Sequence, residues 1–291
     1  MKAANLMDLY SDYLLTSPGA VSALTLVEVL NKAYSHDALT RMLAQPEIEQ
    51  QVFWKKIKPF IRQVENDYGV ISVDDSIEHK PHSTENELIS WHFDHSKGES
   101  VKGIHFVSFT YVTQYGETKI KAPLAWELVR KDKLVEKTEK KDGKFITRQV
   151  RQASVSKIEL VKKRLDILIN HNRVKCKYIV FDTWYSASEL MTYVCDLGKH
   201  FVCALKDNRM ISFDLGDGSE KSKTWIAVGQ AELEPQRAYQ VRVKGVPFTL
   251  NLVKKVYHNL DGSLGVQYLL CSDTVQDNEQ IDQIYKNRWS S

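Results

Sequence analysis

Two aspartates that directly follow short apolar runs are the residues best placed for chemistry in this 291-residue sequence. Asp75 ends the run Ile-Ser-Val-Asp-Asp, and Asp182 ends the run Tyr-Ile-Val-Phe-Asp. Carboxylates brought together at the ends of neighbouring strands bridge divalent cations, because Mg²⁺ and Mn²⁺ prefer hard oxygen ligands. Two such ions, about 3.5–4 Å apart, activate a water and stabilise the leaving oxygen in phosphoryl displacement. Aspartate after a strand is also a common turn or helix-capping residue, and that role is favoured for either residue taken alone.

An alternation of strands and helices surrounds both aspartates. Apolar and β-branched runs predict strands at 70–73, 103–113, 120–129, 178–181 and 201–205, and helical spacing predicts helices at 155–169 and 187–197. The order is strand, strand, strand, helix, strand, helix, strand. This order is typical of an α/β fold with a mixed sheet and flanking helices.

The segments on either side of this core differ from it in pattern. Residues 1–68 are an N-terminal helical region, which is either a helix-turn-helix-like DNA-binding module or a helical cap. Residues 69–207 form the core, and residues 208–275 alternate apolar and polar positions, which predicts an all-β insertion. Residues 276–291 are predicted to be the start of a C-terminal helix that continues to the end of the chain.

Positive charge is concentrated in one segment. Residues 130–164 hold 13 Lys and Arg against 5 acids, a net charge of +8, while the rest of the chain carries −5. Such a segment suits a nucleic-acid phosphate backbone. A solvated loop and helix face explains it equally well, and the segment is expected to act as a linker ahead of the helix at 155–169.

Bulk properties exclude several classes of protein. The composition, with 43% hydrophobic and 26% charged residues, is that of a globular domain. No apolar run is long enough for a membrane span, and the N-terminus does not resemble a signal peptide. The four cysteines show no Cys-x-x-Cys pair, which favours reduced thiols. His92 and His95 lack a second pair of ligands at zinc spacing.

A third landmark lies near the C-terminus, where Tyr285 and Arg288 are three residues apart and share one face of the predicted helix. Because of this pair and the two aspartates, the sequence resembles the DDE transposases of bacterial insertion sequences. Within that family it resembles the group marked by Tyr-x-x-Arg-x-x-x-Glu-x-x-x-x-x-x-Lys. The resemblance covers roughly residues 70–291. It implies a ribonuclease-H-like fold with a β-rich insertion before the Glu. The signature's Glu would fall one place beyond Ser291, so its Glu and Lys have no counterpart.

The resemblance assigns the first catalytic Asp to Asp75, which is followed by a small hydroxyl residue, with Asp74 as the nearby alternative. It assigns the second to Asp182. Both are implied to be metal ligands for two Mg²⁺ or Mn²⁺ ions. The implied activity is two-metal hydrolysis at the ends of an insertion sequence followed by strand transfer, impaired here by the absence of the Glu.

Further residues receive DNA-binding roles from the same resemblance. Tyr285 and Arg288 are implied to contact phosphate, Lys80 lies just after the first aspartate and is a candidate DNA contact, and Trp225 matches an aromatic residue that stacks on a flipped base. For Trp225, packing in the core is the more favoured reading. Lys80 is alternatively a solvated surface residue.

The implied partners are DNA at the element ends and at the target, bound by a homodimer, with no membrane. The implied location is the bacterial cytoplasm, in association with the nucleoid. A catalytically inactive DNA-binding remnant is the alternative function, and an unrelated ribonuclease-H-like nuclease without preference for element ends is a third.

Overall fold

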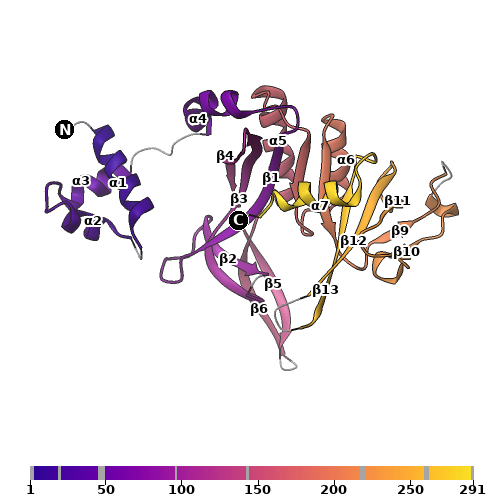
Figure 1. Ribbon diagram of the computed structural model, residues 1–291. Helices are drawn as coiled ribbons and strands as arrows, with labels where there is room; N and C mark the ends of the chain where they lie inside the picture. Colours follow the sequence, from indigo (N-terminus) through magenta and orange to yellow (C-terminus); the bar gives the residue numbers. More distant parts are fainter. Residues whose placement is uncertain are drawn as a thin grey trace. The chain divides into compact units, whose positions relative to one another are not determined.

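A large mixed β-sheet organises most of the chain in the computed structural model, which describes residues 3–18, 21–44, 50–95, 97–141, 144–216, 220–258 and 262–289 (Figure 1). The strands of this sheet are β1 (Val70–His79), β2 (Ile89–Asp94), β3 (Glu99–Tyr115), β4 (Thr118–Leu128), β7 (Tyr178–Phe181), β8 (His200–Leu205), β9 (Met210–Ser212), β10 (Ile226–Ala227), β11 (Ala238–Val243), β12 (Leu250–His258) and β13 (Leu264–Cys271). Among the described residues the strand order is β10-β9-β11-β12-β13-β8-β7-β1-β3-β2, with β4 also pairing with β3.

The centre of the sheet has the order β4-β3-β1-β7-β8. β1, β3 and β4 form an antiparallel meander, whereas β7 runs parallel to both β1 and β8. The two parallel pairings require crossover connections, which the helix Lys157–Asp166 before β7 and the helix Ser188–Asp196 after β7 provide. This arrangement is ribonuclease-H-like and confirms the predicted α/β fold with a mixed sheet and flanking helices.

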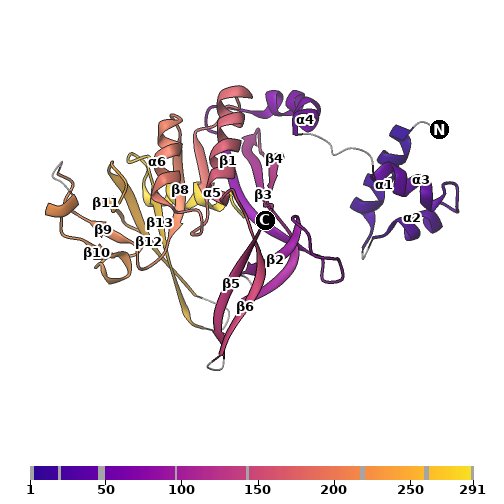
Figure 2. The same cartoon turned by 180° about the vertical axis from the view of Figure 1, so that it is seen from behind.

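Helices cover both faces of the sheet. α4 (Gln50–Val64), α5 (Lys157–Asp166) and α6 (Ser188–Asp196) pack on one face, and α7 (Asn278–Lys286) packs on the other. Figures 1 and 2 show α7 and the α5–α6 pair from opposite sides. A π-helical turn, Ile167–His171, follows α5, and 3₁₀ turns lie at Glu220–Ser222 and Val228–Gln230.

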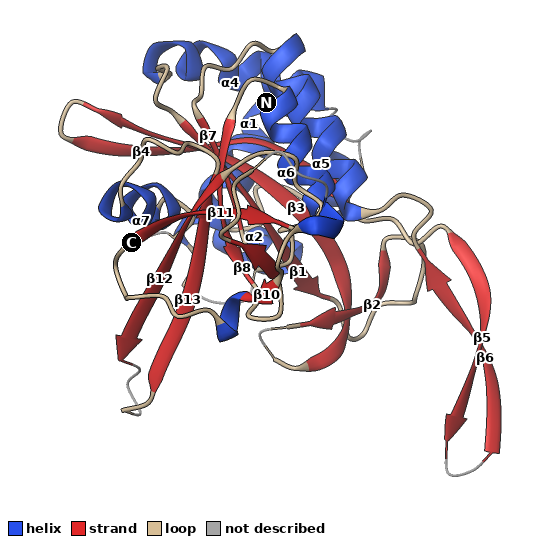
Figure 3. Ribbon diagram, turned by 90° about the vertical axis from the view of Figure 1, so that its right-hand side faces the viewer, coloured by secondary structure: helices blue, strands red, loops and turns tan. Residues whose placement is uncertain are grey.

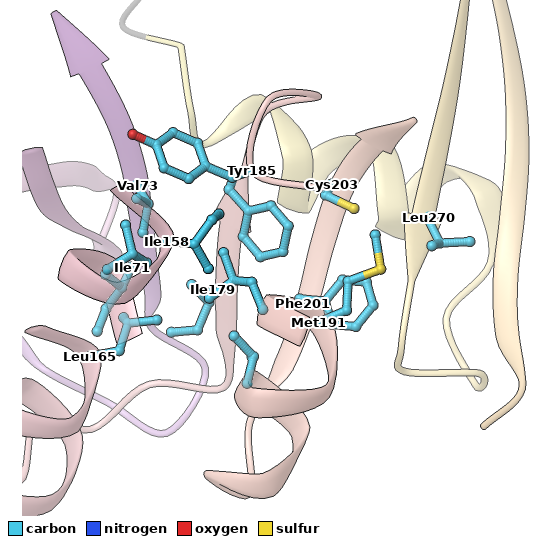
Figure 4. Packing of buried hydrophobic residues seen from close by; sticks show 14 of the residues in the cluster. Ile71, Val73, Ile158, Leu165, Ile179, Tyr185, Met191, Phe201, Cys203 and Leu270 are labelled. Atoms are coloured by element: carbon cyan, nitrogen blue, oxygen red, sulfur yellow. The ribbon is translucent and has the colours of Figure 1, made fainter. Parts of the chain in front are cut away.

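The alternation of side chains along β1 separates two cores. Ile71 and Val73 are fully buried and belong to the cluster under α5 and α6, which Figure 4 shows from close by. Val70 belongs to the cluster that contains Ile281 and Tyr285 of α7. β1 continues past the aspartates to His79, and because successive side chains of a strand point to opposite faces, Asp74 and Asp75 in its middle point to opposite faces as well.

The strands after residue 208 extend the same sheet. β13 pairs antiparallel with β8, for example through Leu270 and Cys203, and β12 pairs with β13 along its whole length. Leu250, Leu252 and Leu270 are fully buried in the main core. The all-β character predicted for 208–275 is therefore present in strands that continue the central sheet, together with the two short 3₁₀ turns.

The basic segment contains an element that its sequence pattern did not predict. It forms a two-stranded antiparallel ribbon, β5 (Lys133–Lys141) with β6 (Lys144–Gln152), so the linker interpretation is wrong. Lys and Glu have low strand propensity, and neither strand shows an apolar face that would mark it. Here the pairing of the two strands decides the conformation. The edge strand β2 was also missed.

The helices before β1 divide between two compact units. α1 (Ala3–Thr16), α2 (Ala23–Val29) and α3 (His36–Leu43) form a small core of their own around Leu26 and Leu39, which are almost fully buried. The units are Met1–Val52 and Phe53–Ser291. Ile61 and Val64 of α4 are buried in the core of the larger unit, so α4 lies with the sheet although it precedes residue 68.

Two further features concern the cysteines and the hydropathy of the helices. Cys176, Cys195, Cys203 and Cys271 are all free thiols. Within the described ranges, no helix has the length and apolar character needed to cross a bilayer.

A buried carboxylate ties β7 to the segment after β13. Asp273 is 5% exposed; it accepts a hydrogen bond from the Tyr178 hydroxyl at 2.7 Å and forms an ion pair with Lys177 at 2.8 Å. Burial by itself would raise the pKa of Asp273, but the hydrogen bonds from Lys177 and Tyr178 outweigh it and hold the pKa at about 2.

We expect Asp273→Asn to lower the free energy of unfolding by about 2 kcal/mol at pH 7. The pKa in the folded state lies below that of the unfolded chain, so this stabilisation is complete above about pH 4 and is lost as the pH falls towards 2. Urea unfolding of both proteins between pH 7 and pH 3 measures it. If the difference in the free energy of unfolding between wild type and Asp273→Asn does not become smaller below pH 4, the ion-pair explanation is contradicted. The control is Asp67→Asn, because Asp67 is exposed.

Candidate active site

Parallel pairing of β1 with β7 brings two aspartates together. The register pairs Val70 with Tyr178 and continues to Val73 with Phe181, so the next step along both strands places Asp74 beside Asp182. Ligand oxygens of Asp74, Asp75 and Asp182 all lie within 4.8 Å of one another. Within the described part of the chain, this is the cluster of His, Cys, Asp and Glu residues capable of holding a metal ion.

The side chains of Asp74 and Asp75 point to opposite faces of β1. The Asp75 carboxylate lies on the α5 side, where Lys157 of α5 donates to it at 2.7 Å and His105 of β3 forms a hydrogen-bonded ion pair with it. Burial by itself would raise the pKa of Asp75, but hydrogen bonds from His105 and Lys157 lower it to about 2. Asp75 is therefore ionised and already neutralised by its neighbours.

Lys157 and His105 are in turn held in place. The Lys157 ammonium lies 3.6 Å from the centre of the Trp184 ring, a cation–π contact. His105 Nδ1 lies 3.2 Å from His92 Nδ1, and His92 Nε2 lies 3.0 Å from the Ser90 hydroxyl. Burial, followed by the nearby charges of Lys131 and His105, lowers the pKa of His92 to about 3, so this imidazole is neutral at physiological pH.

His92 is therefore part of a buried series of hydrogen bonds that connects Ser90 with Asp75 through His105. The other histidine of the His-x-x-His pair, His95, makes an edge contact with the Phe93 ring at 4.9 Å between centroids. The two histidines do not form a metal cluster among the described residues.

Asp74 and Asp182 face the other side of β1, towards the segment after α7. Arg288 Nη2 lies 3.2 Å from Asp74 Oδ2 and 4.0 Å from Asp182 Oδ2. Burial raises the pKa of Asp74; the Arg288 charge opposes this, and the charges of Asp182 and Asp75 add to it. A guanidinium here supplies the positive charge that two adjacent carboxylates require, and a divalent cation satisfies the same requirement with hard oxygen donors.

The turn after β7 orients Asp182. Its Oδ1 accepts hydrogen bonds from the backbone N–H groups of Trp184 at 2.9 Å and Tyr185 at 3.2 Å. This is an Asx-type turn, which explains why an aspartate ends the strand. One oxygen is thus committed to the turn, and Oδ2 faces Arg288 and Asp74.

Tyr285 and Arg288 come together as predicted from their spacing, but the helix that carries them is shorter than predicted. α7 ends at Lys286, and Arg288 lies in the following turn, where its N–H bonds to the Tyr285 carbonyl at 3.0 Å. Such i to i−3 bonds tighten the last turn of a helix. Tyr285 is 2% exposed in the core, and its hydroxyl accepts a hydrogen bond from Arg288 Nη1 at 2.8 Å. Tyr285 therefore positions Arg288.

The two remaining predicted site residues lie elsewhere. Lys80 follows the far end of β1 and pairs with Glu78 at 3.1 Å. Trp225 lines a separate pocket beside Arg242 and Gly245, and its indole N–H donates to the Glu220 carbonyl at 2.8 Å. Neither lines the hollow around the carboxylates.

That hollow has a volume of about 590 Å³. Besides the three aspartates, its walls include Lys157, Lys206, Trp184 and Phe93. Phe93 is 52% exposed and Trp184 is 37% exposed, which is unusual for large aromatic side chains and suits contact with a flat base or sugar. No sequence motif marked Lys157, His105 or Phe93. The available signal for Lys157 was its place in the basic segment 130–164, near the start of the predicted helix.

Comparison with known proteins adds one family match. The family model described as DDE superfamily endonuclease matches residues 2–215. No curated protein matches the sequence. Among solved structures, the chain is similar to a piggyBac transposase in a synaptic complex with hairpin DNA, at 13% sequence identity and a TM-score of 0.46. That match covers 98% of this chain and 55% of the other, so this chain spans about half its length.

The NurA nuclease from Sulfolobus solfataricus is a second structural neighbour, at 7% identity and a TM-score of 0.27 over 91% of this chain and 86% of that one. Both TM-scores are low, and neither neighbour identifies an activity.

If Asp74 and Asp182 hold a divalent cation, Mn²⁺ will raise the melting temperature by about 5 °C at a hundredfold excess over its Kd, because it binds the folded state alone. We expect Asp74→Asn and Asp182→Asn each to abolish the increase, which differential scanning fluorimetry measures. Asp75→Asn is the matched control and should keep it, since Asp75 is occupied by Lys157 and His105. An increase that survives in Asp74→Asn but is lost in Asp75→Asn would reverse the assignment.

Proposed function

Because the chain belongs to the DDE superfamily endonucleases, we propose that it is a DNA transposase that cleaves and joins strands at the ends of an insertion sequence. The observation that carries the proposal is the register of β1 with β7, which sets Asp74 beside Asp182 with Arg288 between their carboxylates. The expected cofactor is Mg²⁺ or Mn²⁺, with two ions. Binding as a homodimer to two element ends is part of the same proposal.

The ligand pair in this proposal is Asp74 and Asp182, and Asp75 takes a supporting role. Asp74 and Asp182 share a face of the sheet and a single cationic neighbour, whereas Asp75 is neutralised on the opposite face. A carboxylate that is already hydrogen-bonded to the Lys157 ammonium and the His105 imidazole offers less attraction to a metal ion. Asp75 instead hydrogen-bonds to Lys157, which lines the pocket with it, and to His105, and so holds the middle of β1 against α5 and β3.

The residues around the pocket suit a phosphodiester substrate. A divalent ion, when bound by the carboxylates, supplies activation of the attacking water and stabilisation of the leaving oxygen. Arg288, whose side chain is 5% exposed, contacts Asp74 through Nη2 and adds positive charge beside the two carboxylates. Trp184 and Phe93 flank the opening and exclude water from one side of it. Lys206, also on the wall, adds positive charge for the phosphate backbone.

The test is strand cleavage of duplex DNA that carries the genomic sequence flanking the coding region, in the presence of Mn²⁺. We expect Asp74→Asn and Asp182→Asn each to reduce the cleavage rate about a thousandfold, since a metal ion contributes several kcal/mol to the transition state. For Asp75→Asn we expect a smaller loss, about ten- to a hundredfold, as is typical of residues that support metal ligands. Denaturing gel electrophoresis of end-labelled DNA measures all three rates.

Full activity of Asp182→Asn would overturn the proposal. Equal cleavage of flanking and unrelated DNA would instead indicate a nuclease without preference for element ends. The melting temperature of each variant serves as the control for folding.

DNA binding without cleavage is the second candidate function. It is favoured by the engagement of Asp75, the third carboxylate of the described cluster, with Lys157 and His105, which leaves two carboxylates facing Arg288. A gel shift with flanking DNA, combined with no cleavage by the wild-type chain in Mn²⁺, would support this function.

A further inference from the structure

The β5–β6 ribbon is the part of the larger unit that the fold itself does not require. Its strands pair with each other and with no other strand among the described residues. Figures 1 and 3 show the ribbon extending from the sheet, away from α4, α5 and α6. Its nine paired positions span about 30 Å at roughly 3.3 Å per residue. A two-stranded ribbon of this kind gains little stability by itself, so its retention calls for a function.

The base of the ribbon is fixed to the body of the protein. Asp132 accepts hydrogen bonds from the Ser154 N–H at 2.8 Å and from the Ser154 hydroxyl at 2.7 Å, which clamps the two ends of the ribbon together. The Lys131 N–H donates to the Glu87 carbonyl at 2.7 Å, which ties the entry of β5 to the segment before β2. The ribbon is therefore anchored where it meets the sheet.

The ribbon carries a net positive charge. Residues 133–152 contain seven Lys and Arg against three acids, a net charge of +4. The register places Lys137 directly opposite Arg148. A polyanion that lies along the ribbon meets both cationic side chains at this one register position. Exposed apolar side chains accompany the charge, with Leu134 59% exposed and Phe145 77% exposed.

A hollow of about 630 Å³ lies at the foot of the ribbon. Four cationic residues, Lys131, Lys137, Arg148 and Arg151, line it, together with one acid, Glu85. Arg151 Nε is 4.0 Å from the Glu85 carboxylate, at the limit for an ion pair, so the lining keeps an excess of positive charge.

This hollow shares a wall residue with the carboxylate pocket. Phe93 lines both of them, and Trp91, which is 52% exposed, lies beside it in the basic hollow. A surface with positive charge and exposed aromatic side chains thus leads from the three aspartates to the ribbon. Such a surface matches the backbone and sugars of a nucleic acid.

We propose that the β5–β6 ribbon is a DNA-binding arm that lies along duplex DNA next to the cleaved position. A two-stranded ribbon fits the roughly 12 Å width of the major groove. At about 3.4 Å per base step, a 30 Å ribbon matches roughly nine base pairs. Lys133, Lys137 and Arg148 contact phosphates and hold the duplex so that one strand reaches Asp74 and Asp182. The inference rests on the proposed function in taking DNA as the substrate.

The experiment measures binding of the full chain to a fluorescently labelled duplex of about 30 base pairs in EDTA, by fluorescence anisotropy across a range of salt concentrations. The ribbon variant is Lys133→Gln/Lys137→Gln/Arg148→Gln. Loss of three phosphate contacts should weaken binding on the order of a hundredfold at 0.1 M salt. It should also lower the slope of log Kd against log salt by about 2 to 3.

The matched control removes the same charge from α4, with Lys55→Gln/Lys56→Gln/Lys58→Gln. These three lysines are exposed, belong to the same unit, and lie at the end of that unit away from the ribbon (Figure 3). We expect the control to bind DNA nearly as tightly as the wild type. Charge reversal with Lys133→Glu/Lys137→Glu/Arg148→Glu is the second variant, and thermal melting shows whether each variant is folded.

The outcomes separate this inference from the proposed function. If the ribbon variant and the α4 control bind DNA with equal affinity, the proposal that the ribbon is a DNA-binding arm is overturned, whether or not the wild type cleaves DNA. Loss of affinity in the ribbon variant alone supports the arm, even if the wild type does not cleave and the proposed transposase activity fails. If the ribbon variant keeps its DNA affinity but changes the oligomeric state in light scattering, the ribbon is an interface between copies of the chain, and the DNA-binding arm is overturned.

Discussion

Parallel pairing of β1 with β7 places two carboxylates side by side where β7 ends. The two negative charges repel each other, and the surrounding structure compensates for this repulsion. Asp74 and Asp182 lie beside each other one step beyond a register of four buried residue pairs. Like charges at such short range raise the pKa of one partner unless a cation lies near. Arg288 supplies that cation from the segment after α7, and its own position depends on the buried Tyr285.

The two faces of β1 divide the three aspartates into two electrostatic environments. Asp75 points towards α5 and is neutralised by Lys157 and His105, with a chain of hydrogen bonds continuing to His92 and Ser90. Asp74 points towards α7 and shares Arg288 with Asp182. A shift of one position along a strand therefore changes the chemistry available to a carboxylate, because successive side chains face opposite sides of the sheet.

Negative and positive side chains of the larger unit are concentrated in two neighbouring regions. Acidic oxygens are concentrated in one hollow, and cationic side chains line the neighbouring hollow and the ribbon above it. Phe93 belongs to both. The segment 130–164, which carries the excess positive charge of the sequence, thereby becomes both the ribbon and, through Lys157, a wall of the carboxylate pocket.

Apolar periodicity and short-range spacing are local properties, so they were enough to predict the α/β class, the mixed sheet, the buried strand that ends at Asp182, and the spacing of Tyr285 and Arg288. The choice between Asp74 and Asp75 was not local: it required the β1–β7 register and the position of Arg288, more than 200 residues away in the chain. The ribbon was also decided by tertiary structure, since cross-strand pairing overrode the low strand propensity of its Lys and Glu residues. Lys157 and His105 became part of the site only when α5 and β3 packed against the middle of β1.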